Sequence, residues 1–202
     1  MNKGLMIVIS GPAGSGKGTV NAHLLATGDF VYSVSATTRA PREGEIDGVN
    51  YHYITKEEFL SRIESGDMLE YTEYCGNFYG TPKKEAEAVL ASGKNLILEI
   101  EVEGARNVKA KYPDAVLVLL LPPSYSIQEA RLRGRGTETE EKILERLARA
   151  KEEVALADCY DYVVYNYDGR AWDAAEQILA IVEAEKHSIK RNRDVAKNYL
   201  NA

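Results

Sequence analysis

Residues 5–19 read Leu-Met-Ile-Val-Ile-Ser-Gly-Pro-Ala-Gly-Ser-Gly-Lys-Gly-Thr, and this stretch decides the fold. Its apolar part, residues 5–9, predicts a strand that is buried on both faces. Residues 11–17 match the Gly-x-x-x-x-Gly-Lys spacing of a phosphate-binding loop. Glycines allow backbone N–H groups to face a polyphosphate at the positive end of the following helix. We therefore predict a triphosphate site at Gly11, Pro12, Ala13, Gly14, Ser15, Gly16, Lys17, Gly18 and Thr19.

Lys17 distinguishes a phosphate-binding loop from a simple glycine-rich turn. In a phosphate-binding loop the lysine reaches the β- and γ-phosphates, whereas a glycine-rich turn between a strand and a helix gives it no role. The next residue, Gly18, stands where a Ser or Thr usually offers a hydroxyl group to Mg²⁺. Thr19 and Ser15 are the candidate hydroxyl groups, directly or through water, and the sequence does not choose between them.

The composition is that of an ordinary globular protein. Of the 202 residues, 45% are hydrophobic, which is enough for a substantial core. The net charge of −6 argues against binding nucleic acid through bulk positive charge. The sequence starts without a signal peptide pattern and has no apolar stretch of about 20 residues. We expect reduced thiols at Cys75 and Cys159, a cytoplasmic location, and no membrane or nucleic-acid partner.

Apolar runs alternate with amphipathic helical patterns, which is typical of a parallel sheet covered by helices. Strands are predicted at residues 5–9, 96–100, 116–121 and 162–165, and helices at 17–26, 104–112, 126–132, 139–157 and from 171 into the tail. This pattern predicts a three-layer α/β core with ligands at the carboxyl ends of the strands. The basic stretch 186–197 predicts an exposed terminal helix.

Residues 33–92 interrupt the alternation. Short aromatic and β-branched segments separated by turn residues predict strands at 32–34, 51–54, 69–74 and 77–79. A helix is predicted at Lys56–Ile63, with Thr55 as its cap and Gly66 at its end. We interpret this region as a small mixed α+β lobe inserted into the core.

Residues 33–42 of this lobe, Ser-Val-Ser-Ala-Thr-Thr-Arg-Ala-Pro-Arg, combine four hydroxyl groups with two arginines. Arginine binds phosphate with two parallel hydrogen bonds, so two converging arginines can neutralise a phosphate dianion. Further motifs follow in order: Gly44-Glu45, Gly48-x-x-Tyr51, Met68-Leu69-Glu70-Tyr71, Gly76-Asn77-Phe78-Tyr79-Gly80-Thr81, Leu98-Glu99-Ile100-Glu101-x-x-Gly104-Ala105, Arg131-Leu132-x-Gly134-Arg135-Gly136-Thr137-Glu138 and Asn166. Together with the phosphate loop, these motifs resemble the guanylate kinases, a family of P-loop nucleoside monophosphate kinases, from about residue 5 to about residue 185.

The resemblance implies an acceptor site for GMP in the lobe. Residues matching Arg39, Arg42, Tyr51 and Tyr79 hold the monophosphate, and those matching Ser35, Glu70, Thr81 and Glu101 read the guanine. A carboxylate suits guanine because it accepts hydrogen bonds from N1–H and from the exocyclic amino group, whereas adenine would leave it unpaired. Glu70 is therefore the expected specificity residue. Glu99 and Glu101 replace the aspartates that are common in the family, so each carboxylate enters the site by a different path.

The resemblance also implies a mobile arginine-rich lid. Arg131, Arg135 and Arg146 match residues that close over ATP and the transferred phosphoryl group, and Asn166 matches a contact to the donor adenine. Lys17, Arg39, Arg135 and Arg146 are the expected catalytic residues, since positioning and positive charge promote phosphoryl transfer. For Arg133 and Arg149 the sequence leaves two alternatives open: a role in the lid, or a position on a solvated helix face.

The resemblance predicts an ATP:GMP phosphotransferase, with Mg²⁺ held by Thr19 and Glu99 through water. It implies a single guanylate kinase-like domain, residues 1–202, with these parts: core 1–32, 93–123 and 158–185; GMP lobe 33–92; lid 124–157; basic helical tail 186–202. The alternatives are an interaction module of the same fold that binds phosphorylated peptides, and a kinase for a phosphorylated sugar or another nucleotide. Monomer and homodimer both remain open.

Overall fold

The structure is a computed structural model that describes residues 3–74, 76–136 and 138–201. Cys75, one of the two expected thiols, and Thr137, part of the arginine-rich motif, lie outside the described residues. Cys159 carries a free thiol and is partly buried. None of the helices in the described ranges is long and apolar enough to span a membrane.

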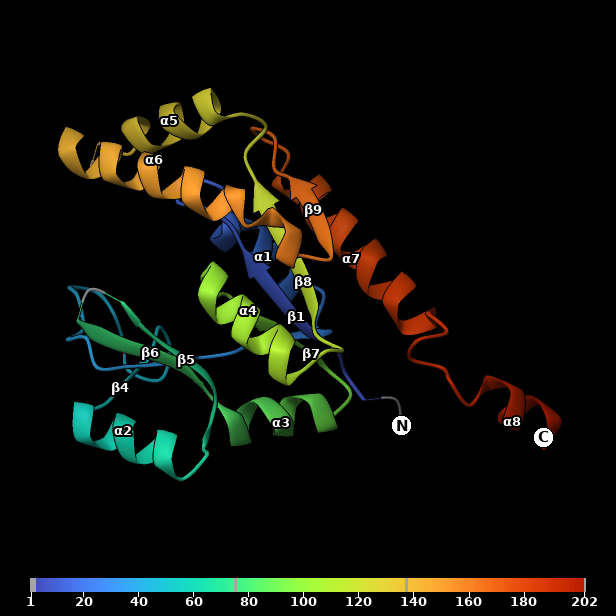
Figure 1. Cartoon of the computed structure of the whole chain (residues 1–202). Helices are drawn as coiled ribbons and strands as arrows, with labels where there is room; N and C mark the ends of the chain where they lie inside the picture. Colours follow the sequence, from blue (N-terminus) through green and yellow to red (C-terminus); the bar gives the residue numbers. More distant parts are fainter. Residues whose placement is uncertain (1–2, 75, 137, 202) are drawn as a thin grey trace.

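The elements alternate between strands and helices, with a run of short strands in the first half of the chain (Figure 1). In chain order they are β1 Met6–Ser10, α1 Lys17–Ala26, β2 Phe30–Tyr32, β3 Ala36–Thr37, β4 His52–Tyr53, α2 Lys56–Glu64, β5 Met68–Tyr74, β6 Asn77–Pro82, α3 Lys83–Ala91, β7 Asn95–Leu98, α4 Val102–Lys111, β8 Val116–Leu121, α5 Tyr125–Gly134, α6 Glu140–Ala155, the 3-10 turn Ala157–Cys159, β9 Tyr162–Tyr165, α7 Ala171–His187 and α8 Val195–Leu200.

A five-stranded parallel sheet forms the centre of the molecule, with the strand order β2-β7-β1-β8-β9. One face packs against α1 and α7 through residues such as Val20 and Ile178. The other face packs against α3 and α4 through residues such as Leu90 and Val108. Because both faces are covered, the three central strands β7, β1 and β8 are almost entirely apolar, and the predicted three-layer α/β core is confirmed.

A second, four-stranded sheet with the order β4-β3-β6-β5 forms the inserted lobe, and α2 packs on it (Figure 1). Phe59 of α2 is fully buried against Ala36 and Met68 of this sheet. The side chain of Thr55 accepts a hydrogen bond from the backbone N–H of Glu58, so the predicted cap of α2 is present.

Helices α5 and α6 lie beyond the ends to which the parallel strands point (Figure 1). Ser124 and Thr139 cap them by accepting hydrogen bonds from Ile127 N and Lys142 N. The two helices share a small apolar cluster of Leu132, Ile143 and Leu147, which also contacts Ala13 of the phosphate loop. This arrangement connects the lid helices to the loop that they face.

Three details of the predicted elements are wrong. The strand expected at 32–34 is β2, residues 30–32, and it pairs with β7 in the central sheet rather than in the lobe. Helix α3 was not predicted, because only Ala86 and Leu90 on it are buried and its apolar pattern is short. The helix expected over 186–197 is interrupted, because α7 ends at His187 and residues 189–194 contain turns before α8.

Candidate active site

The phosphate loop joins β1 to α1 at the carboxyl end of the central sheet. Gly16 adopts a left-handed conformation with φ of 86°, and a Cβ atom there would collide with the side-chain amide of Asn166. Lys17 is the first residue of α1, and the first turn contains no acidic residue. The free N–H groups of this helix end therefore form a positive site that suits a phosphate group.

Side chains from distant elements hold the loop through its carbonyl oxygens. Asn166, directly after β9, donates from Nδ2 to Ser15 O at 2.8 Å. Arg131 of α5 donates to Gly14 O at 3.1 Å and to Asn166 O at 2.7 Å. Gln128, also on α5, donates to Ala13 O at 2.9 Å. Because the carbonyl oxygens are bound from outside, the N–H groups of the loop can point toward a ligand.

Lys17 is influenced by acidic groups from two parts of the chain, the segment between β7 and α4 and helix α6. Its Nζ donates to Gly11 O at 2.6 Å. Burial lowers the pKa of Lys17, and the charges of Glu99, Glu153 and Glu101 act in the opposite direction. The charge of Arg135 lowers the pKa of Lys17 further. The pKa of Lys17 is therefore set by burial and by charges of both signs.

Glu99 lies between the loop helix and the lobe. Asn21 of α1 donates to its carboxylate at 2.7 Å, and the hydroxyl group of Tyr32 lies 3.4 Å from the same oxygen. A cavity of about 360 Å³ is lined by Glu99, Gly18 and Asn21 from the core and by Glu45 and Tyr51 from the lobe, among others. Glu99, an expected metal-binding residue, and Tyr51, an expected phosphate-binding residue, therefore face a shared space.

Glu70 and Thr81 form the buried part of the predicted acceptor site. They are directly paired in the β5–β6 hairpin, and the Thr81 hydroxyl group donates to Glu70 Oε1 at 2.8 Å. Burial raises the pKa of Glu70, while the Thr81 hydroxyl group and the charge of Lys111 oppose the rise. The second carboxylate oxygen lies near Gly104 of α4, where a Cβ atom would be only 3.1 Å away. Glu70 therefore lies between the β5–β6 hairpin and α4.

Arg39 is held at the edge of the lobe by Glu45. Its guanidinium group donates to both carboxylate oxygens of Glu45, at 3.0 and 2.9 Å, and lies over the ring of Tyr51. The backbone N–H of Arg42, the hydroxyl group of Tyr53 and the Arg39 guanidinium group lower the pKa of Glu45 to about 2. Glu45 therefore stays ionised and fixes the position of Arg39.

The remaining predicted phosphate ligands lie near Arg39. The rings of Tyr51 and Tyr79 are 6.0 Å apart, between centroids. Arg42 is exposed on the following turn, and its backbone N–H is bound to Glu45 at 2.7 Å. Ser35 immediately precedes β3, where its carbonyl oxygen accepts from His52 N at 2.9 Å. The Gly44-Glu45 motif does not itself indicate a role for Glu45, and the structure shows that its carboxylate supports Arg39.

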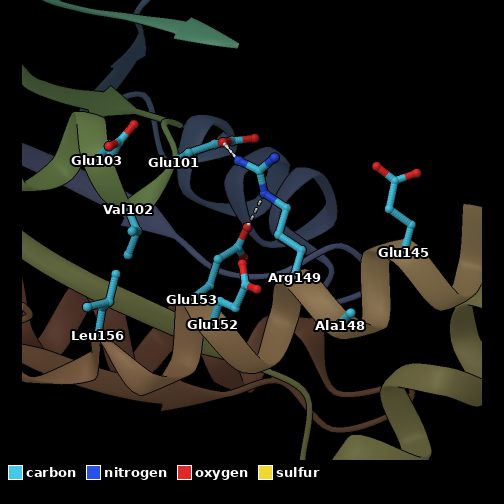
Figure 2. A pocket seen from close by; sticks show the side chains of 9 residues that line it. All are labelled: Glu101, Val102, Glu103, Glu145, Ala148, Arg149, Glu152, Glu153 and Leu156. Atoms are coloured by element: carbon cyan, nitrogen blue, oxygen red, sulfur yellow. Dashed lines mark hydrogen bonds and ion pairs between the residues drawn. The ribbon is translucent and has the colours of Figure 1, made fainter. Parts of the chain in front are cut away.

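The lid arginines have different partners. Arg146 forms an ion pair with Glu138 at 2.6 Å, and Arg131 pairs with Asp168 at 2.7 Å. Arg133 pairs with Glu129 and Glu140, so its contacts stay within the lid. Arg149 instead pairs with Glu101 at the start of α4 and with Glu153 one turn along α6 (Figure 2). This pair between the lid and the core joins residues 48 positions apart, and no sequence signal indicated it.

Comparisons with known proteins agree on one family. The family model "Guanylate kinase" matches residues 3–185. A guanylate kinase of Clostridium tetani is 46% identical over 194 residues, which cover 96% of this chain and 92% of the relative. One from Streptococcus agalactiae is 50% identical over 191 residues, which cover 94% and 90%. The crystal structure of guanylate kinase from Anaplasma phagocytophilum matches with a TM-score of 0.75 at 32% identity, covering 95% of this chain and 90% of that one.

Proposed function

The chain belongs to the guanylate kinase family, and from this premise we propose how its residues transfer the γ-phosphoryl group of ATP to GMP, giving ADP and GDP. The single observation that best supports GMP as the acceptor is the buried pair of Glu70 and Thr81. A buried carboxylate is costly unless a ligand supplies hydrogen-bond donors to it. Guanine offers two such donors on one edge, which adenine does not.

Recognition of the guanine combines this pair with Ser35 and Glu101. Glu70 accepts from N1–H and from the amino group, and the hydroxyl group of Thr81 donates to Oε1 of the same carboxylate, which has four lone-pair sites. An acceptor that lacks these donors leaves the carboxylate buried and unpaired, which can reduce kcat/KM by about 10⁴-fold. A phosphorylated sugar is disfavoured as the acceptor because it does not present these two paired donors to the carboxylate.

The monophosphate is held by Arg39, Arg42, Tyr51 and Tyr79 in this proposal. An oxygen of the GMP phosphate attacks the γ-phosphorus of ATP, the bond from this phosphorus to the bridging oxygen breaks, and ADP leaves. Arg39 is already oriented by Glu45, so little ordering is required when the phosphate binds. The ordered arginine thus keeps the attacking oxygen in line with the donor.

The donor triphosphate binds the loop at residues 11–19, with Asn166 beside the adenine. Lys17, Arg135 and Arg146 stabilise the negative charge on the phosphoryl group during transfer. The charge of Arg135 lowers the pKa of Lys17, which supports a shared role at the phosphoryl group. In this proposal the lid closes over the lobe, that is, residues 124–157 close over residues 33–92. Closure excludes water that would otherwise hydrolyse ATP.

The residues near Gly18 suit Mg²⁺, which prefers oxygen ligands. Asn21 Oδ1 is buried beside Glu99 and has no hydrogen-bond partner among the described residues, and Gly18 has open space where a side chain would be. We assign the ion to Thr19 and Glu99, through water. When bound with ATP, Mg²⁺ neutralises charge on the phosphate oxygens.

The location and the assembly of the enzyme belong to the same proposal. We place the enzyme in the cytoplasm, where ATP and GMP are both present, and include neither nucleic acid nor membrane among its partners. The domain boundaries are those implied by the sequence: the core includes residues 1–32, 93–123 and 158–185, and a basic tail follows at 186–202. A monomer and a homodimer are both compatible with this mechanism.

A coupled assay of ADP release with GMP, AMP, CMP and UMP as acceptors tests the proposal. We expect turnover with GMP to exceed turnover with each other nucleotide by at least about 10³-fold in kcat/KM. Equal turnover of GMP and AMP would contradict it. Binding of a phosphorylated peptide, measured by fluorescence titration, without any turnover of GMP would instead favour the interaction module.

A further inference from the structure

Arg149 is the lid residue that reaches the predicted guanine site. It lies on α6, and its guanidinium group pairs with Oε2 of Glu101, the residue that immediately precedes α4. A second bond, from Nε to Glu153 at 3.1 Å, fixes the arginine on its own helix (Figure 2). The side chain therefore bridges the lid and the acceptor site.

The surroundings explain why Glu101 needs this partner. A cavity of about 420 Å³ lies beside the pair, and its lining includes Glu103, Glu145, Glu152 and Glu153 as well as Glu101. Of the described residues that line it, Arg149 alone is basic. Carboxylates at this density repel one another, so without Arg149 the Glu101 side chain would favour orientations farther from its neighbours. Lys17 adds positive charge from the loop side.

We propose that Arg149 is a positioning residue for guanine recognition: it holds Oε2 of Glu101 so that Oε1 faces the guanine amino group. The inference rests on the proposed function, since it assigns a support to one of the guanine-reading residues. A carboxylate has four lone-pair sites, so an arginine on one oxygen leaves the other free to accept. The glutamate at position 101 has one more methylene than an aspartate, and Arg149 limits this additional freedom.

The contact also couples the lid to the acceptor site. Arg149 belongs to α6, whereas Glu101 is fixed by the start of α4 in the core. The conformation in which the pair forms is therefore the one in which Glu101 is oriented for GMP. The lid position in which the pair forms and GMP binding then favour each other, because linkage between two sites is reciprocal.

The test compares Arg149→Gln with Arg133→Gln in the full chain. Both arginines are about equally exposed, at 37% and 40%, and both pair with two described glutamates, but the partners of Arg133 lie within the lid. Partly exposed ion pairs change an equilibrium by at most about fivefold. We therefore expect the Kd of GMP, measured by calorimetry, to rise about fivefold in Arg149→Gln and to stay unchanged in Arg133→Gln. The KM of ATP and kcat are expected to stay within about twofold.

A second pair of variants separates positioning from general support of the lid. Arg149→Lys keeps the charge and is expected to restore most of the affinity for GMP. In a Glu101→Gln background, Arg149→Gln is expected to have no further effect, because the two residues act through one contact. Any one of three results would overturn the inference. The first is that the effects of the two substitutions on the Kd of GMP multiply, and the second is that Arg149→Gln leaves this Kd unchanged. The third is that Arg149→Gln raises the KM of ATP and the Kd of GMP by the same factor.

The outcomes also distinguish this inference from the proposed function. If the wild-type protein fails to phosphorylate GMP, the proposed function is wrong. If it phosphorylates GMP while Arg149→Gln and Arg133→Gln bind GMP equally well, only the role of Arg149 is wrong. Thermal unfolding of each variant identifies a loss of fold, in which case Arg149→Lys decides the outcome.

Discussion

The phosphate loop offers backbone N–H groups to its ligand, whereas the pocket around Glu70 offers side chains. In the loop, the side chains of Asn166, Arg131 and Gln128 bind carbonyl oxygens from outside and do not have to touch the phosphates. In the pocket, Glu70 and Thr81 are themselves the groups that would meet the base. The two halves of the proposed active site therefore depend on their side chains in different ways.

This difference has a consequence for specificity. Backbone N–H groups recognise the charge and shape of a phosphate chain, which all nucleoside triphosphates share. A buried carboxylate recognises the arrangement of donors on one base. Changes around Glu70 should therefore alter which acceptor reacts, and changes around the loop should alter how well any donor binds.

Glu70→Gln is expected to have the largest effect, on the acceptor side alone. A glutamine keeps the shape but replaces one accepting oxygen with an amino group that faces the guanine donors. The KM of GMP should rise about 100-fold, because a charged hydrogen bond is lost and a donor is left opposite a donor. The KM of ATP should not change. Steady-state kinetics with each substrate varied in turn measures both constants.

The matched control is Glu73→Gln, on the same strand. Glu73 is exposed on β5, so the same chemical change there should leave both KM values unaltered. If Glu70→Gln bound GMP as well as the wild-type protein, the assignment of Glu70 as the specificity residue would be wrong.

Asn166→Ala is expected to have a smaller effect, on the donor side alone. It removes the hydrogen bond to Ser15 O, and the loss of a buried hydrogen bond costs about 1–3 kcal/mol. Without this hydrogen bond the loop is held less firmly in its ligand-binding conformation. The KM of ATP should therefore rise about tenfold, while the KM of GMP stays constant. Equal increases in both constants, accompanied by a lower Tm, would indicate general destabilisation and contradict the assigned role.

The two halves also differ in how far the sequence predicted them. The loop was predicted from the spacing of neighbouring residues, because a strand, four glycines and a lysine lie within about 15 positions. Its supports were partly predicted: the resemblance named Arg131 and Asn166, but as contacts to the donor nucleotide. Gln128 carried no signal, since a lone polar residue on a helix has no distinguishing pattern.

The acceptor pocket depends on contacts between distant residues, which a single sequence does not reveal. Glu70 and Thr81 were named from the family resemblance, and the hairpin of β5 and β6 then brings them into register. The pair of Arg149 with Glu101 could not be predicted, because α6 contains many alternating charges that all resemble a solvated face. Strand β2 was assigned to the wrong sheet for a similar reason, since its residues favour a strand without specifying its partner.

The pH dependence of GMP binding is expected to show the smallest effect and to distinguish the two halves most clearly. Burial raises the pKa of Glu70 above its ordinary value of 4.5, and only the ionised carboxylate can accept both guanine donors. As the pH falls toward this raised pKa, GMP affinity should weaken severalfold, and ATP affinity should lack this change. The GMP phosphate also titrates, near pH 6, so the quantity to measure is the ratio of the Kd values of Glu70→Gln and wild type.

This ratio cancels the titration of the phosphate and leaves that of Glu70. It should be large and constant at neutral pH and should fall as the medium becomes acidic, because protonated Glu70 loses its advantage over glutamine. The stability of the protein should depend on pH in the opposite way to its affinity for GMP. Because the pKa of Glu70 is higher in the folded state, its contribution to the free energy of unfolding is greatest below the unfolded pKa. This contribution is lost as the pH rises through the folded pKa. In the absence of GMP, Glu70→Gln should therefore have the higher Tm at neutral pH, and this advantage should shrink in acid. A ratio that stays constant from pH 7 to pH 4.5 would show that burial of Glu70 does not control guanine binding.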